Sequence, residues 1–355
     1  LTNVTGYSVK RGEGLINFSH GGTHGDIDGD GDIDVVLSSN DMVGTNGEVI
    51  CLMNDGTGHF KSKKCGNQIG QTATLGDYDG DGDLDLFVGI RLKPGSIGVP
   101  QNGYILENNG KGEFTDATLE LAPELIGLGM ITDAKWEDIN GDGIKDLITC
   151  GDWNNINLFY NDGNSLVKDS TFIGNDLYGW WFSIETTDLN NDGLMDIIIG
   201  NIGNNTKLKP SKNSPVRMYI NDFDDNSKSE NIITYMLNSK EYPLANKDEL
   251  TKELNYLKRD FFYYKDFAGL EIDEIFSDKL LSGSDVFFVN DFNSKVLINR
   301  GSEFEQINLP LMSQIAPVRA VSYTHLRAHE TEAYLECRLL LEKKNGGGGG
   351  GGGGG

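Results

Sequence analysis

The sequence predicts an all-β protein: a fragment of a β-propeller made of four-stranded antiparallel blades, with one helical insertion. Three observations lead to this expectation. An acidic nine-residue segment recurs along the chain, beginning at residues 26, 77, 138, 188 and 222. A short apolar segment rich in β-branched residues follows the first four copies, and an Asn/Asp/Gly turn recurs in step with them. Repeats of roughly 40 to 50 residues are typical of propeller blades.

The composition excludes several classes of protein. The 355 residues include 54 acidic and 30 basic ones, for a formal net charge of −24, so the chain as a whole would repel a nucleic acid. No stretch of about 18 apolar residues occurs, so we expect no membrane span. The chain begins with Leu1, without a basic segment followed by an apolar run, and we expect a secretion signal to be either absent or already removed.

The first four acidic segments share one pattern of side chains. Position 1 is Asp, position 3 is Asp or Asn, position 5 is Asp, position 6 is Gly and position 9 is Asp. The candidate metal ligands are Asp26, Asp28, Asp30, Asp32 and Asp34; Asp77, Asp79, Asp81, Asp83 and Asp85; Asp138, Asn140, Asp142, Ile144 and Asp146; and Asp188, Asn190, Asp192, Leu194 and Asp196. A degraded fifth copy lacks the glycine, and its weaker candidates are Asp222, Asp224, Asn226, Lys228 and Glu230.

This spacing predicts calcium binding. Side chains at alternate positions of a curling backbone converge on one point, and position 7 can add a main-chain carbonyl oxygen. Hard oxygen donors in this number suit Ca²⁺, which accepts about six to eight of them, better than Mg²⁺ or Zn²⁺. A merely solvated acidic loop would have no reason to keep the spacing. We expect about four Ca²⁺ sites, with the fifth segment as a weaker candidate.

The segments do not match an EF-hand. An EF-hand loop ends with Glu at position 12 and is flanked by helices. Here position 12 is Leu37, Val88, Thr149 or Ile199, and the residues that follow each loop predict strands.

Each repeat reads as an acidic loop, two strands, a hairpin turn and a last strand. The predicted turns are Asn54-Asp55-Gly56, Asn108-Asn109-Gly110, Asn161-Asp162-Gly163 and Asn299-Arg300-Gly301. Leu250, Leu254 and Leu257 recur at helical spacing within 247–279. We expect blades over 1–238, a helical insertion over 239–282 and the remainder of a blade over 283–320. The insertion either packs its apolar face on the propeller or acts as a partner-docking lid.

Residues 321–355 are interpreted as a non-native tail. The order of residues from Val321 to Thr331 resembles a translated sequencing adapter, and ten glycines close the chain from Gly346 to Gly355. The alternative is a basic amphipathic tail with a flexible glycine linker. We expect the natural protein to continue past Ala320, so that the propeller as given lacks its last blade.

On these residues the chain resembles the FG-GAP/VCBS-repeat β-propellers over most of 20–320. The loop and strand from Asp77 to Gly89 carry the resemblance, and a sharper stretch runs from Gly179 to Asp224. That stretch is similar to bacterial secreted proteins with an ASPIC/UnbV-type domain beyond the propeller, which is missing here. The resemblance implies an extracellular or envelope-anchored binding scaffold that recognises a protein or glycan at the cell surface, without established catalysis.

Catalysis and sugar binding are the alternatives. The histidines before the tail are His20, His24 and His59, and no Gly-x-Ser-x-Gly elbow accompanies them. His24 is either a ligand or base beside the first loop or an ordinary loop residue. A calcium-dependent polysaccharide lyase or glycoside hydrolase is the enzyme alternative. The candidate ligand-binding residues, which either stack on sugars or fill gaps between blades, are Trp153, Trp180 and Trp181.

The three cysteines before the tail do not make a disulfide framework. Cys51 and Cys65 flank a turn, so they either face each other across a hairpin or remain ordinary buried thiols, like Cys150.

Overall fold

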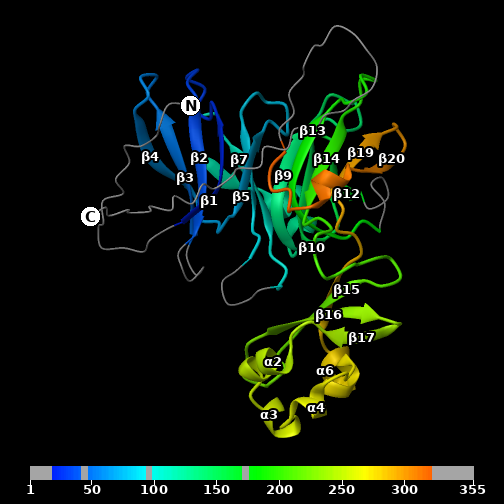
Figure 1. Ribbon diagram of the computed structural model, residues 1–355. Coiled ribbons are helices and arrows are strands. Elements are labelled where there is room, and N and C mark those ends of the chain that lie inside the picture. Colours follow the sequence, from blue (N-terminus) through cyan, green and yellow to red (C-terminus); the bar gives the residue numbers. More distant parts are fainter. Residues whose placement is uncertain (1–17, 41–46, 93–97, 170–175, 322–355) are drawn as a thin grey trace, which may run out of the picture.

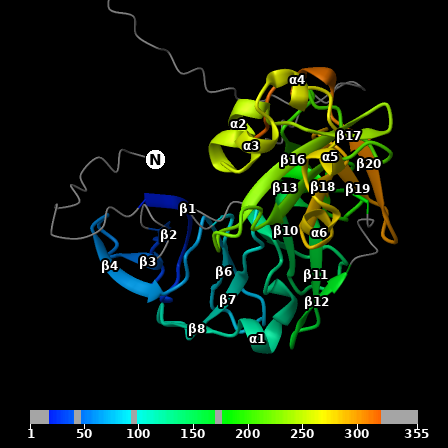
Figure 2. The same ribbon diagram turned by 90° about the horizontal axis from the view of Figure 1, so that it is seen from below.

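The computed structural model describes residues 18–40, 47–92, 98–169 and 176–321. They form an all-β, propeller-like arrangement with one inserted lobe, which confirms the predicted fold class (Figures 1 and 2). The predicted tail lies outside the described residues from 322 onward. Across the described ranges, no helix is long and apolar enough to cross a membrane.

Four blades of four antiparallel strands follow one another in an arc (Figure 2). Their first strands lie side by side. The strands are β1 (Phe18–Gly25), β2 (Asp34–Asn40), β3 (Gly47–Asn54) and β4 (Phe60–Gly66) in blade 1; β5 (Thr72–Gly76), β6 (Asp85–Gly89), β7 (Gly103–Asn108) and β8 (Phe114–Asp116) in blade 2; β9 (Met130–Glu137), β10 (Asp146–Asn154), β11 (Asn157–Asn161) and β12 (Leu166–Asp169) in blade 3; and β13 (Gly179–Thr187), β14 (Asp196–Asn201), β19 (Lys295–Asn299) and β20 (Phe304–Asn308) in blade 4.

Short helical turns follow two of the blades. After β8 come α1 (Thr118–Leu121) and η1 (Pro123–Leu125), and after β20 comes η2 (Leu311–Gln314). Blades 3 and 4 are joined directly, because Asp152 of β10 pairs with Trp180 of β13 and Asn154 pairs with Gly179.

The second strands of blades 2, 3 and 4 are deeply buried, whereas β2 of blade 1 alternates between buried and half-buried residues. Every residue of β6 and β14 is buried, because side chains of neighbouring blades pack on these strands. Val36 and Val49 of blade 1, for example, share one cluster with Leu86 and Leu106 of blade 2. This two-sided burial explains why the apolar runs after the acidic segments are continuous rather than alternating.

A separate lobe is inserted between β14 and β19 (Figure 1). Its sheet has the order β17-β16-β15-β18. The strands are β15 (Val216–Asn221), β16 (Glu230–Leu237), β17 (Lys240–Pro243) and β18 (Asp285–Val289), and the helices are α2 (Lys247–Glu253), α3 (Leu257–Asp260), α4 (Tyr264–Phe267), α5 (Ile272–Ile275) and α6 (Asp278–Ser282).

The lobe differs in extent from the predicted insertion over 239–282. The strands within 216–237 belong to the lobe and not to a blade, because β15 pairs with β18, which follows the helices in the chain. Correspondingly, 285–289 completes the lobe sheet, and the return to blade 4 begins only at β19.

The helices of the lobe pack on its own sheet. Leu250, Leu254 and Leu257 are buried in one cluster with Phe223 and Ile232. The expectation that their apolar face packs on the propeller is therefore corrected: the lobe has its own core.

The base of the lobe rests on the blades. Met218 and Val289 of its sheet share a buried cluster with Met130 and Trp153 of blade 3. The lobe leaves blade 4 after β14, whereas the acidic loop of that blade precedes β14. Because consecutive antiparallel strands turn at opposite ends, the lobe and the acidic loops of the blades lie at opposite ends of the strands.

A disulfide joins Cys51 of β3 to Cys65 of β4, with a Cα–Cα distance of 5.9 Å. The structure thus selects the pairing across the hairpin. Cys150 is free and buried, and burial raises the pKa of its thiol.

Candidate metal sites

The five acidic loops share one backbone conformation, and each joins two consecutive antiparallel strands. Positions 4 and 6 of every loop have positive φ; they are Gly29, Gly31, Gly80, Gly82, Gly141, Gly143, Asn191, Gly193, Asp225 and Ser227. Glycine adopts this conformation without a steric penalty. In the fifth loop Asp225 and Ser227 adopt it at φ 61° and 66°, so this loop keeps the same fold without either glycine.

Main-chain N–H groups hold the carboxylates in place. Asp26 accepts hydrogen bonds from Gly29 at 2.8 Å and Gly31 at 2.9 Å, and Asp28 accepts one from Asp30 at 3.3 Å. The bond from position 6 to the carboxylate at position 1 recurs in all the other loops. The carboxylates are thus ordered by the backbone, which reduces the entropy lost when a ligand binds.

The carboxylate at position 9 is buried and connects the loop to its blade. Asp85 is 1% exposed, and the equivalent aspartates of the other three blades are fully buried. One of its oxygens accepts from the N–H of Tyr78 at 3.3 Å and the other from the N–H of Asn108 in the hairpin at 2.9 Å. The same pair of bonds recurs in the other blades.

Burial raises the pKa of this carboxyl group in blades 2, 3 and 4. The pKa of Asp85 rises to about 7 and that of Asp146 to about 6, while the pKa of Asp196 rises as well. Nearby loop carboxylates add to the effect through charge repulsion. A divalent cation would reverse this shift, because its charge favours the ionised form.

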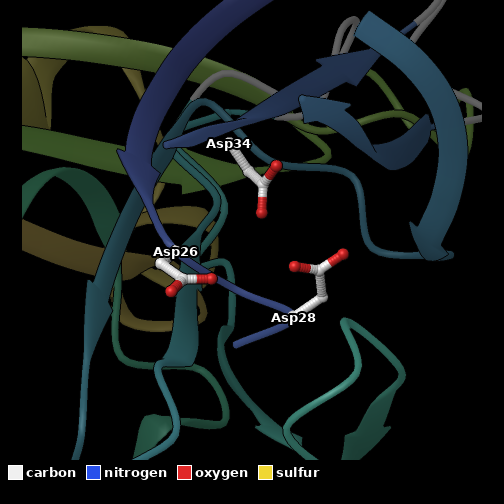
Figure 3. A group of neighbouring side chains, drawn as sticks. All are labelled: Asp26, Asp28 and Asp34. Atoms are coloured by element: carbon white, nitrogen blue, oxygen red, sulfur yellow. The ribbon is translucent and has the colours of Figure 1, made fainter. Parts of the chain in front are cut away.

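Three carboxylates converge in the first, second and fifth loops. Oxygens of Asp26, Asp28 and Asp34 lie within 4.8 Å of one another, and Figure 3 shows these groups around a common space. Two oxygens bound to one Ca²⁺ at roughly 2.3 to 2.6 Å lie at most about 5 Å apart. Each trio therefore fits one ion. The other two trios are Asp77, Asp79 and Asp85, and Asp222, Asp224 and Glu230.

The fifth loop carries a second indication. Asp224 Oδ1 is buried and, among the described residues, has no hydrogen-bond partner. A buried oxygen without a partner costs about 1 to 3 kcal/mol of stability. A bound cation would supply the missing partner. The loop joins β15 to β16, so this candidate site lies in the lobe and not in a blade as predicted.

The third and fourth loops have Asn at position 3. Asn140 donates to Asp142 at 2.9 Å and Asn190 donates to Asp192 at 2.7 Å. Neither loop has three carboxylates within the same distance in the described ranges. Because an amide oxygen is also a ligand for Ca²⁺, the Asn side chain would complete the trio with the carboxylates at positions 1 and 9.

The remaining predicted ligands lie outside the trios. At position 5, Asp30 and Asp81 accept the N–H of position 7. At position 7, the carboxylates of Asp32 and Asp83 lie against the hairpin glycines, so that a Cβ at Gly56 would meet Asp32 Oδ2 at 2.5 Å. The side chains of position 7 therefore face the hairpin rather than the trio.

The hairpin asparagines link neighbouring blades. Asn108 donates through Nδ2 to Ile27 O at 2.9 Å. Two further bonds of the same kind join Asn161 to Tyr78 O at 2.6 Å and Asn299 to Ile139 O at 2.9 Å. Each acceptor is position 2 of the acidic loop in the preceding blade. Sequence reasoning identified these residues only as turn formers; their recurrence one blade after each loop was the signal for the link.

The side chains of the three candidate tryptophans are mostly buried. Trp181 is fully buried and Trp153 is 6% exposed, while Trp180 is half-buried and its ring lies 5.5 Å from that of Trp153. This burial favours the alternative that they pack between elements over the one in which they stack on sugars. His24 is exposed on β1 and does not belong to the trio beside it.

A surface cavity of about 440 Å³ lies between β4 and β8. Its lining includes Lys64, Gln68, Phe114 and Asp116. Gln68 donates to Asp116 at 3.2 Å, so part of the polar lining is already paired.

The profile of the FG-GAP-like repeat matches residues 26–88 and 138–199. Each match begins at the first residue of an acidic loop, includes the next acidic loop and ends in the strand after it. No curated protein matches the chain significantly. The resemblance predicted from the recurring loops is thus confirmed for these segments: the chain carries FG-GAP-like repeats at 26–88 and 138–199, on a propeller-like fold.

Proposed function

We propose that this protein is a calcium-stabilised binding or adhesion scaffold that acts outside the cytoplasm and recognises a protein or a glycan. The FG-GAP-like repeats and the propeller-like blades support a scaffold role. A propeller offers a partner a broad face of loops and only short, protected strand edges.

The convergence of Asp26, Asp28 and Asp34 carries the calcium part of the proposal. Main-chain N–H groups fix these carboxylates, so they cannot move apart to relieve their repulsion. The recurrence of the same loop in each blade argues against a chance acidic cluster.

Bound Ca²⁺ would supply the positive charge that offsets the repulsion between carboxylates. Positions 1, 3 and 9 would hold it. Position 9 also binds the hairpin of its own blade, and position 2 accepts the asparagine of the next blade. Ordering one loop would therefore stiffen the contact between two blades.

Binding is preferred to catalysis for a structural reason. The patterned carboxylates are engaged by main-chain N–H groups of their own loops. A lyase or hydrolase would need a base directed at a substrate beside the ion, and His24 is the candidate nearest to the first loop.

A thermal melt with Ca²⁺ and with excess chelator tests the proposal. A site filled at ten times its Kd adds about 1.4 kcal/mol to the free energy of unfolding, so several sites should raise the Tm by several degrees. Protein and glycan arrays probed in both conditions should show partner binding that depends on Ca²⁺. An unchanged Tm after verified metal removal would contradict the calcium part, and substrate turnover during the array assay would favour the enzyme alternative.

A further inference from the structure

The lobe ends in an exposed aromatic tip. Phe262, Tyr263 and Tyr264 follow one another from the end of α3 to the first residue of α4 and are 73%, 58% and 55% exposed. Figure 1 shows α3 and α4 at the end of the lobe that is remote from the blades. Contiguous exposed aromatic side chains of this kind mark interaction surfaces.

Two lysines accompany these rings. Lys265 Nζ lies 5.3 Å from the centre of the Tyr263 ring, and Lys247 Nζ lies 5.3 Å from that of Tyr264. Within the described parts of the chain, the salt bridges do not involve either lysine. The tip therefore presents aromatic rings with two ammonium groups that lie outside the described salt bridges, and with one carboxylate, Asp248, which accepts from the Tyr264 hydroxyl at 2.7 Å.

The charge around the tip is balanced. Residues 247–266 include five basic and five acidic side chains, in a chain of net charge −24. The acidic loops of the blades lie at the opposite end of the strands from the lobe. At a Debye length of about 8 Å, their charge is screened from a surface that touches the tip.

We propose that the tip, formed by Phe262, Tyr263 and Tyr264 with Lys247 and Lys265, docks on a lipid surface. Aromatic rings and lysines suit the boundary between headgroups and acyl chains, where the rings lie in the interface and the ammonium groups reach phosphates. A sugar instead needs a flat, free ring face. Here a lysine covers a face of each tyrosine, and Phe262 stands at 85° to Tyr263 with 4.8 Å between ring centres.

Vesicle co-sedimentation of the full chain tests the proposal. Phosphatidylcholine vesicles, alone and mixed with phosphatidylglycerol, should bind the wild type. The double variant Phe262→Ser/Tyr263→Ser should bind at least about tenfold more weakly, because each ring loses its buried apolar area. The control Leu311→Ser/Met312→Ser changes side chains that are 78% and 76% exposed in η2 and should bind like the wild type.

A second variant reports insertion directly. In Phe262→Trp, vesicles should shift the fluorescence to shorter wavelength, and brominated lipids should quench it. Running both assays with Ca²⁺ and with chelator separates this surface from the metal sites. Equal sedimentation of the wild type and the double variant, or no spectral shift, would overturn the proposal, as would tip-dependent binding to a glycan or protein array without vesicle binding.

Discussion

At the scale of single residues, contacts across the boundary between two blades set the tolerance to substitution. Gly76 ends β5, just before the second acidic loop, and a Cβ there would meet the Trp136 ring of blade 3 at 2.4 Å. Gly80 lies within that loop with φ 75°, and a Cβ there would meet no atom within 4 Å. Glycine is therefore required at the two positions for different reasons: packing at Gly76 and backbone conformation at Gly80.

The variants Gly76→Ala and Gly80→Ala separate these causes. Gly80→Ala should lower the free energy of unfolding by about 1 to 2 kcal/mol, because alanine is strained at this positive φ. Gly76→Ala should lower it by more, because the added methyl group would overlap the largely buried Trp136 ring. Overpacking of this kind typically costs about 1 to 3 kcal/mol. Urea unfolding gives both values, and a smaller loss for Gly76→Ala would contradict the packing described for this boundary.

The buried loop carboxyls predict a pH dependence in the absence of metal. Folding raises the pKa of Asp85 to about 7 and that of Asp146 to about 6, so between about pH 4 and pH 7 the folded state binds more protons than the unfolded state. With chelator present, the free energy of unfolding should therefore fall as the pH rises through this range. Chemical unfolding at pH 5 and pH 8 checks the sign, and greater stability at pH 8 would refute it.

At the scale of elements, the hairpin asparagine of one blade secures the acidic loop of the preceding one. Asn108 bonds both Ile27 O of blade 1 and Leu84 O of its own blade. Asn54 occupies the same place in blade 1, and its Nδ2 donates to Ile33 O of its own blade. The two residues thus form a matched pair: among the described hydrogen bonds, the Asn108 side chain reaches another blade and the Asn54 side chain does not.

Replacing each asparagine with alanine measures the link. Asn108→Ala should lower the free energy of unfolding by about 1 to 3 kcal/mol, because it leaves buried carbonyl groups without a donor. Asn54→Ala should have a clearly smaller effect. Similar losses in the two variants would show that the bond to Ile27 adds little.

The sequence predicts blades 1 to 3 well because each of them is encoded locally, whereas the lobe interrupts blade 4. Loop, strand and hairpin lie within one repeat, and the periodic glycines and asparagines mark the turns. The extent of the lobe could not be predicted in this way, because the pairing of β15 with β18 spans the helices between them. The fifth acidic loop resembles the others in sequence, so nothing local distinguishes a lobe hairpin from a blade.

The geometry of the candidate metal sites could likewise be predicted only in part from the sequence. In the first and second loops the carboxylates at positions 1, 3 and 9 converge, since nine residues suffice to form the turn. Position 5, which the alternate spacing placed with positions 1 and 3, lies outside the trio. The orientation of Asp32 toward Gly56 depends on a hairpin twenty or more residues away, and the links made by Asn108 and Asn161 join different blades. Such contacts depend on how blades are placed relative to one another, which a single repeat does not encode.

At the scale of the whole molecule, the acidic loops of the blades are separated in space from the tip of the lobe. The acidic loops of the blades lie at one end of the strands, and the lobe with its charge-balanced tip leaves at the other. Four bound Ca²⁺ ions would change the net charge from −24 to about −16. Metal binding in the blades and lipid docking at the tip of the lobe would then occur at different ends of the same scaffold.

Metal analysis of the full chain tests the central claim most directly. After equilibration with Ca²⁺ and removal of free ions, the wild type should retain about four ions per chain, or five if the lobe loop also binds. The variant Asp77→Asn/Asp79→Asn/Asp81→Asn should retain one fewer, because it removes three of the five carboxylates of that loop, two of them from the trio. A wild type without bound Ca²⁺, or a triple variant with the full number of ions, would contradict the account.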